Sequence, residues 1–351
     1  MKTYKNFHCF LSLGVLLAIC TPALSQTPPV LGVQLCAGVS ITGTNAGLYA
    51  VQATGNLADS NSWACVGLVQ LPATNYFWTD TSKSAATGQR FYRVVPAATN
   101  LVYILPGTFT MGSPATEALR GSDEVPHVVT ITKGFYMGKY LVTQTNYVSV
   151  VGGNNPSHFN TNSLTCAVEG VSWYDASNYC VVRTIQERAA GLIPTNWVYR
   201  LPTESEWEYA CRAGTTTALF LGGALHSQQA NFAGTTEYDS TSGNVNNASG
   251  VFLQTTVPVG NYAANGWGLF DMAGNVFEWC QDWYGAYPTG SVTNDPQGPV
   301  SGSARVYRGG GWPSSGYLCR SAQRSSISPS NKTTSFGFYA IGFRVVLAPT
   351  Q

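Results

Sequence analysis

The segment that decides the fold of this 351-residue chain is Arg305-Val306-Tyr307-Arg308-Gly309-Gly310-Gly311-Trp312. It is followed by Cys319-Arg320-Ser321-Ala322-Gln323-Arg324, and then by Ile341-Gly342-Phe343-Arg344-Val345. Between the first two segments, the interval Trp312-Pro313-Ser314-Ser315-Gly316-Tyr317-Leu318 contains no cysteine.

Six further motifs precede this segment, in a fixed order along the chain. They are Phe109-Thr110-Met111-Gly112-Ser113, Glu124-Val125-Pro126-His127-Val128-Val129, Phe135-Tyr136-Met137-Gly138, Val171-Ser172-Trp173-Tyr174-Asp175-Ala176, Tyr199-Arg200-Leu201-Pro202-Thr203-Glu204-Ser205-Glu206-Trp207-Glu208-Tyr209-Ala210 and Gly268-Leu269-Phe270-Asp271-Met272-Ala273-Gly274-Asn275-Val276-Phe277-Glu278-Trp279. Each motif alone has low specificity, whereas all six in this order along one chain form a specific pattern.

Two of these motifs open helices. Residues 172–175 have the form of a capping box, which predicts a helix from there to about residue 190. Residues 203–206 have the form of a second capping box, and Gly214 is expected to end that second helix. Trp207, Ala210 and Cys211 then share one helix face. Two helices with many short strands and long loops indicate an α+β domain. We expect such loops at residues 154–157 and 240–250.

Taken together, the motifs from Ile104 onward resemble the formylglycine-generating enzyme family, the sulfatase-modifying factors. The resemblance does not reach residues 1–98. It implies a C-type-lectin-like α+β domain that binds calcium. It also implies an activity: oxidation of a cysteine in a sulfatase precursor to formylglycine with oxygen as acceptor, at copper(I) held by two cysteines. The substrate would be a protein or peptide, a sulfatase among the candidates.

Two carboxylates, Asp271 and Glu278, bracket a glycine turn. Calcium needs six to eight oxygen ligands, some of them backbone carbonyls exposed at a turn. From the residues alone, a capped turn with Glu278 as a buried hydrogen-bond acceptor explains the pattern better than a calcium site does. The resemblance implies a calcium site with four ligand residues: Asp271, the carbonyls of Gly274 and Val276, and Glu278. It implies a second site that begins at Asn231 and Phe232, whose remaining ligands fall in a divergent loop near Asp239.

Seven cysteines follow residue 25, an odd number that leaves at least one thiol unpaired or intermolecular. The resemblance implies a disulfide between Cys211 and Cys319, and we expect Cys319 to open a strand. Cys180 matches a family cysteine whose partner position is occupied here by Val345, so we expect no bridge there. Cys36 and Cys65 are candidates for a second disulfide, in the N-terminal part of the chain.

The catalytic cysteines of the family would lie within residues 312–318, where this chain has none. Gly311 also replaces the usual serine, and Phe277 stands where tryptophan is common. Ser314 offers a hard oxygen, which is a weak ligand for copper(I). His127 and His158 are isolated histidines, which are more often packed and hydrogen-bonded than metal-bound. No catalytic residue is therefore assigned.

Other enzyme classes lack their sequence signals. The chain has no Gly-x-Ser-x-Gly elbow, no phosphate-binding glycine loop and no HExxH motif. Glu204, Glu206 and Glu208 alternate along a helix, where neighbouring positions diverge, so they do not form an acid/base pair.

The N-terminal end has the form of an export signal. Residues 1–25 combine a charged start, a short apolar run and a small-x-small cleavage site, and the run is too short to span a bilayer. Removing them changes the formal charge from +1 to −1. A near-neutral chain without a basic run gives no electrostatic case for nucleic acid. We expect a secreted, periplasmic or cell-surface protein.

Residues 26–98 predict a small all-β, sandwich-like domain. The segments 48–53 and 91–95 alternate like half-buried strands. Residues 99–351 form the second predicted domain. The sequence thus predicts an exported two-domain protein whose sulfatase-modifying-factor-like domain is a non-catalytic binding or structural module. The alternative is an active formylglycine-generating oxidase with a divergent site, which would require copper.

Overall fold

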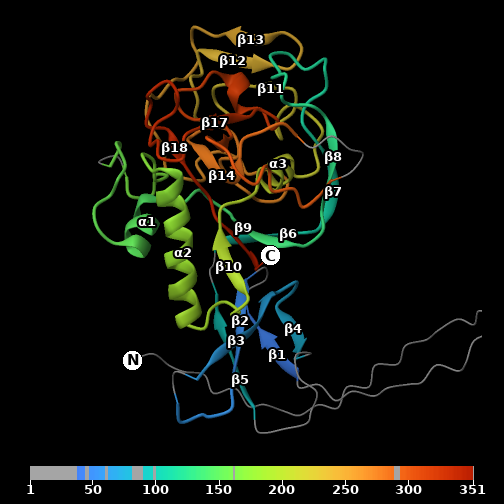
Figure 1. Cartoon of the computed structure of the whole chain (residues 1–351), viewed down its shortest axis with the longest axis vertical. Helices are drawn as coiled ribbons and strands as arrows, with labels where there is room; N and C mark the ends of the chain where they lie inside the picture. The colour runs from blue at the N-terminus through green and yellow to red at the C-terminus, as the bar shows by residue number, and fades with distance from the viewer. Residues whose placement is uncertain are drawn as a thin grey trace, which may run out of the picture. The chain divides into compact units, whose positions relative to one another are not determined.

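The computed structural model describes residues 38–43, 47–59, 62–80, 90–97, 100–160, 163–287 and 293–350 (Figure 1). The predicted signal segment, residues 1–25, and Cys36 lie outside the described residues. The chain divides into two compact units. The first comprises residues 1–99 with 187–195, and the second residues 100–186 with 196–351. None of the described helices is both long and apolar enough to cross a membrane.

The first unit is built from two small antiparallel sheets. Strand β1 (Gly38–Thr42) pairs with β4 (Asn75–Thr79), and β2 (Leu48–Thr54) lies between β3 (Ala64–Gln70) and β5 (Phe91–Pro96). The strands predicted at 48–53 and 91–95 are thereby confirmed as β2 and β5. β2 is not half-buried as predicted: six of its seven residues are buried, since Val51 packs in a cluster with Ile41 and Val69, and Gln52 donates to the Gly191 carbonyl.

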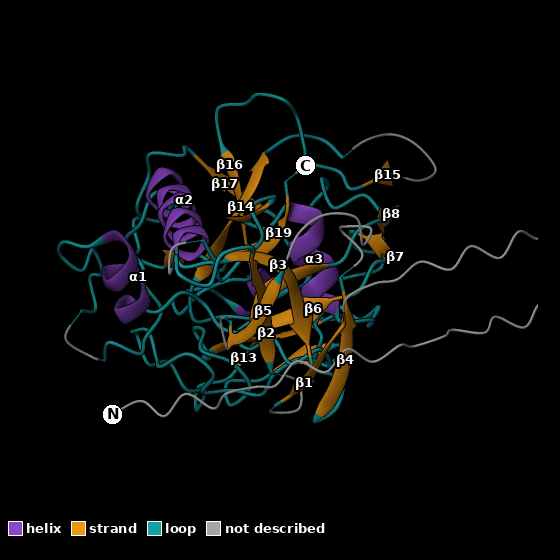
Figure 2. Cartoon of the chain, turned by 90° about the horizontal axis from the view of Figure 1, so that it is seen from below, coloured by secondary structure: helices purple, strands orange, loops and turns teal. Residues whose placement is uncertain are grey.

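The second unit is a mixed α+β domain, as the sequence predicts (Figure 2). Its described strands form four sheets, ordered β10-β19-β9-β6, β17-β16-β14-β18, β15-β8-β7 and β11-β12-β13. The strand bounds are β6 Leu101–Ile104, β7 Gly107–Met111, β8 His127–Ile131, β9 Phe135–Gly138, β10 Trp197–Arg200, β11 Ala224–Leu225, β12 Thr236–Asp239, β13 Gly243–Asn246, β14 Phe277–Trp283, β15 Thr293–Asn294, β16 Arg305–Arg308, β17 Ser325–Ile327, β18 Ile341–Gly342 and β19 Val346–Pro349.

Both predicted helices form at their capping boxes. Helix α2 spans Trp173–Ala189, and the Ser172 hydroxyl donates to Asp175 at 2.7 Å. Helix α3 spans Glu204–Arg212 with a complete capping box at Thr203. All nine residues of α3 are buried, so its carboxylates face protein rather than water. Each of these buried carboxylates has an ion-pair partner, as described below.

Three details differ from the sequence predictions. A further helix, α1 (Gln144–Val151), was not predicted. The loop predicted at residues 240–250 contains β13, which pairs with β12. The segment that starts at Cys319 is not the predicted strand: the 3-10 helix η1 (Gly316–Cys319) ends there and a turn follows. At this turn the Arg320 side chain donates to the Tyr317 carbonyl at 3.0 Å and pairs with Glu117 and Glu124.

Buried arginine–glutamate pairs attach the C-terminal segments to the rest of the second unit. The arginines belong to the segments that decided the fold from sequence. Their pairs are Arg308 with Glu208, Arg320 with Glu117 and Glu124, Arg324 with Glu204, and Arg344 with Glu278. Their side chains are at most 5% exposed. A buried charge without a partner is costly, so these pairs constrain how the segments pack.

Candidate functional site

Three segments that are distant in sequence meet around the glycine turn of residues 271–278. Gly274 N donates to the Gly309 carbonyl at 2.8 Å, and Trp312 N donates to the Asn275 carbonyl at 2.9 Å. Asn275 N donates in turn to the carbonyl of Asn231 at 2.7 Å. The predicted calcium ligands therefore lie next to the interval in which the family's catalytic cysteines would stand.

Backbone shape accounts for the glycine in this turn. Gly274 has φ +80°, and a Cβ there would lie 2.5 Å from the Asn231 carbonyl oxygen. Asp271 and Asn275 also have positive φ, of 56° and 66°. Left-handed residues are rarely clustered without a structural need, and this turn uses three to reverse the chain before β14.

Asp271 offers a ligand atom for a cation at this turn. Its Oδ2 accepts from Gly260 N at 2.7 Å, whereas its buried Oδ1 has no hydrogen-bond partner. Burial, above all, together with the neighbouring Glu278, raises the pKa of this carboxyl to about 6. A buried oxygen without a donor is what a calcium ion would satisfy.

Glu278 is already occupied, by Arg344. The two side chains are fully buried and form a bidentate pair, with distances of 2.6 and 2.9 Å. The predicted alternative for Glu278, a buried hydrogen-bond acceptor, describes this arrangement. Within the described ranges, no three His, Cys, Asp or Glu side chains gather in a way that could hold a metal ion. Calcium at this turn would therefore rely on Asp271 together with backbone carbonyls such as those of Gly274 and Val276.

The predicted second calcium site also offers a buried oxygen without a hydrogen-bond donor, but it has no complete ligand set. The buried Asn231 Oδ1 lacks a hydrogen-bond partner, and Phe232 packs in a hydrophobic cluster with Leu219 and Leu225. Asp239 instead closes its own hairpin turn, accepting from Thr241 and Ser242. These bonds lower the pKa of Asp239 to about 2.

We expect calcium to stabilise the second unit through Asp271. A ligand that binds only the folded state adds RT ln(1 + [L]/Kd), about 2.7 kcal/mol at a hundredfold excess over Kd. Melting curves with calcium and with chelator measure this, and elemental analysis measures bound metal. Asp271→Asn should abolish the calcium shift, yet melt no lower than wild type in chelator, because it removes an unpaired buried carboxylate. Identical melting in calcium and chelator, with no bound metal, would exclude the site.

Cys211 and Cys319 are both buried free thiols in the structure. Cys211 Sγ lies 3.6 Å from Ser321 Oγ, and burial, with Cys211 nearby, raises the pKa of Cys319 to about 12. The disulfide between them stays a prediction, which peptide mapping without reduction tests. Cys65 is also buried and free, and its predicted partner Cys36 lies outside the described residues.

The interval 312–318 offers no metal ligand of the expected kind. Ser314 is 4% exposed, and its hydroxyl oxygen accepts from Gly311 N at 3.0 Å. Cys319, the first thiol after the interval, stays protonated at neutral pH because burial raises its pKa. The residues present thus do not fit a copper(I) site.

Aromatic side chains instead surround Trp312. Its ring lies 5.5 Å from Phe159, 5.6 Å from Phe338 and 6.3 Å from Phe252, measured between centroids. We call these four residues the Trp312 cluster. Phe252 and Phe338 are 36% and 44% exposed, so the cluster reaches the surface. Adjacent to it, His158 stacks on Tyr339 at 4.8 Å. The cluster was not predicted from the sequence, because its residues come from separate loops.

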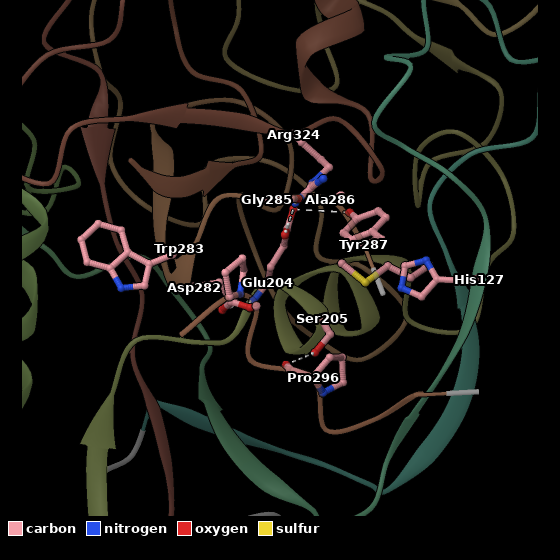
Figure 3. A pocket seen from close by; sticks show the side chains of 13 residues that line it. His127, Glu204, Ser205, Asp282, Trp283, Gly285, Ala286, Tyr287, Pro296 and Arg324 are labelled. Atoms are coloured by element: carbon pink, nitrogen blue, oxygen red, sulfur yellow. Dashed lines mark hydrogen bonds and ion pairs between the residues drawn. The ribbon is translucent and has the colours of Figure 1, made fainter. Parts of the chain in front are cut away.

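A small cavity lies on the β7 side of α3, lined by His127, Glu204, Asp282, Tyr287 and Arg324 among others (Figure 3). His127 packs on the Tyr287 ring at 4.4 Å, and Glu204 points to Arg324. The cavity holds about 20 Å³, room for roughly one water. It is too small for a substrate, and His127 is packed as the sequence predicts.

The fold and this region define a loop-rich α+β domain whose C-terminal segments are held by buried arginine–glutamate pairs around a glycine turn. The family model described as "Sulfatase-modifying factor enzyme 1-like domain" matches residues 89–348. The chain belongs to this family, which confirms the resemblance seen in the sequence.

Named relatives support the same assignment. Mouse formylglycine-generating enzyme is 29% identical over 283 residues, covering 69% of this chain and 74% of that protein. The serine/threonine-protein kinase pkn1 of Chlamydia caviae is 32% identical over 271 residues, covering 69% of this chain, which thus spans only 38% of that relative. Among solved structures, Treponema denticola variable protein 1 matches with a TM-score of 0.56 and 27% identity, over 75% of this chain and 96% of that one.

Proposed function

We propose that this chain is an exported, non-catalytic binding module built on the sulfatase-modifying-factor scaffold. The observation that carries the proposal is the interval 312–318, where the family chemistry needs a pair of thiolates and the chain has serines. A serine hydroxyl stays protonated near neutral pH and binds copper(I) weakly. The hydroxyl of Ser314 is moreover engaged by Gly311 N.

The Trp312 cluster is the surface that we propose for binding. Trp312 itself is only 8% exposed, and its Nε1 donates to the Tyr339 carbonyl at 3.1 Å, so it is a rigid base. Phe338 and Phe252 flank it and expose more of their rings. Aromatic residues supply much contact area at low cost in side-chain entropy, and they dominate many protein-binding surfaces. A protein or peptide ligand fits this chemistry, and a sulfatase is one candidate.

Finer features of the fold belong to this proposal. We infer that the second unit is C-type-lectin-like and that the strands of the first unit form a sandwich. Ile41 of β1 packs in one cluster with Val51 of β2 and Val69 of β3, which supports facing sheets in the first unit. The proposed export rests on residues 1–25.

Capture from the secretome of the source cells tests the binding role. We expect the full chain to retain a protein that the double variant Phe252→Ser with Phe338→Ser does not retain. Both side chains are partly exposed, so the variant should keep the wild-type melting temperature. Val300→Ser, which removes an exposed apolar side chain outside the cluster, is the matched control. Equal capture by the double variant and wild type would show that binding does not use the cluster.

A further inference from the structure

Arg305 differs from the other arginines of the C-terminal segments. Arg308, Arg320, Arg324 and Arg344 all pair with buried glutamates, as described above. Arg305 lies on β16 and forms no ion pair with any carboxylate of the described residues. Its Nη1 donates to the Gln281 carbonyl, and its buried Nε has no hydrogen-bond partner. The side chain is thus a cation without an ion-pair partner among the described carboxylates, although it interacts electrostatically with the buried Asp282.

Two tryptophans hold the Arg305 guanidinium in place. Its Cζ lies 3.6 Å from the ring centroid of Trp283, on β14, and 3.9 Å from that of Trp173, at the start of α2. Two rings this close must cover the two faces of the planar group. Only its edge is then left for hydrogen bonds. On that edge Nε is buried and Nη1 already donates to Gln281, so Nη2 is the group left to donate to a carboxylate. The tryptophans also fix its orientation, so little side-chain entropy is lost on binding.

Arg305 borders a groove between α2, β10 and the end of β19. The groove encloses about 410 Å³, within the range of ligand pockets. Its lining includes the apolar side chains Val181, Val198 and Leu201, together with Trp173. Arg200 lies there as well, but it is already engaged in a bidentate pair with Glu206 at 2.6 and 2.7 Å. The groove therefore combines an apolar wall with a single unpaired cation.

We infer that this groove binds an organic carboxylate, whose apolar body lies against Trp173 and Val198 and whose carboxylate pairs with Arg305. The site is separate from the Trp312 cluster and does not rest on the proposed function. The buried Asp282 does not serve as an internal counter-ion for Arg305 at neutral pH. Burial, first of all, and Glu204 raise the pKa of Asp282 to about 8, so the group is mostly neutral there. The apolar wall favours an organic acid over inorganic phosphate.

Titration calorimetry of the full chain with indole-3-acetate, benzoate and inorganic phosphate tests the inference. We expect both aryl carboxylates to bind, and phosphate to bind about tenfold more weakly or not at all. Arg305→Gln should weaken indole-3-acetate binding by about tenfold or more, the range for losing a hydrogen bond to a charged group. Arg93→Gln is the matched control, because Arg93 also stacks on a tryptophan, Trp63 at 4.3 Å, outside the groove. It should bind as wild type does.

A second variant separates loss of binding from loss of folding. Arg305→Gln removes two cation–π contacts, so its melting temperature is measured alongside. Ser177→Trp fills the groove from α2 and leaves Arg305 intact, and it should abolish binding in a folded protein. Three results would overturn the inference: no aryl carboxylate binds, phosphate binds as well as the carboxylates, or binding survives both variants.

Discussion

Glu208→Ala should destabilise the second unit by about 3–5 kcal/mol, the cost of breaking a buried ion pair. Glu208 is fully buried in α3 and accepts from Gly112 N at 2.9 Å and from Arg212 Nε at 2.9 Å. Its other oxygen pairs with Arg308, which is also fully buried. Removing the carboxylate leaves two buried guanidinium groups without their main counter-charge.

Urea denaturation measures the effect, with Lys332→Ala as the matched control. Lys332 pairs with Asp175 at 3.2 Å, but it is 55% exposed, so this surface pair should contribute at most about 1 kcal/mol. Glu208→Gln keeps the side-chain shape and should fall between wild type and alanine. A loss below 1 kcal/mol for Glu208→Ala would show that the buried pairs do not hold the C-terminal segments in place.

Gly310→Ala should cost about 2–4 kcal/mol, the sum of backbone strain and overpacking. Gly310 has φ +73°, a region that disfavours any Cβ. A Cβ at this position would also meet the Sγ of Cys319, and it would lie 3.1 Å from the Cα and 3.2 Å from the N of that residue. The clash falls at the entrance to the interval 312–318, so it should disturb the loop that carries Trp312.

Gly337→Ala separates strain from collision. Gly337 has φ +80°, close to that of Gly310, but a Cβ there would meet nothing within 4 Å. Its loss should therefore be only the strain of about 1–2 kcal/mol. Thermal denaturation compares the two variants. Equal melting temperatures would mean that the close approach to Cys319 is not a real constraint on the loop.

Local signals in the sequence predicted the regular elements that have them. The capping boxes at residues 172–175 and 203–206 located α2 and α3, because both partners of a capping box lie within four residues. Helix α1 has an N-cap threonine, Thr143, and Gly152 at its end, but these signals were overlooked in a short helix with no acidic residue in its first turn and no basic residue in its last. The turn after Cys319 was missed because the fold of Arg320 depends on glutamates about 200 residues away in the chain.

The candidate site shows the same limit. The absence of cysteine from residues 312–318 can be read directly from the sequence, because it does not depend on contacts with other segments. The Trp312 cluster joins Phe159, Phe252 and Phe338 from three separate loops, so no local pattern predicts it. The lack of an ion-pair partner for Arg305 becomes visible only in the structure, where the other four arginines of the C-terminal segments pair with glutamates.

The most direct test of the central claim is the conversion of cysteine to formylglycine in a peptide with the sequence Cys-x-Pro-x-Arg. The full chain is incubated with copper, oxygen and reductant, beside an active formylglycine-generating enzyme as the positive control. Mass spectrometry detects the change from thiol to aldehyde, and a hydrazine probe reports the aldehyde independently. We predict no conversion by this chain, because residues 312–318 supply no thiolate. Copper-dependent conversion that persists in Cys319→Ala would contradict the account and place an active site elsewhere in the domain.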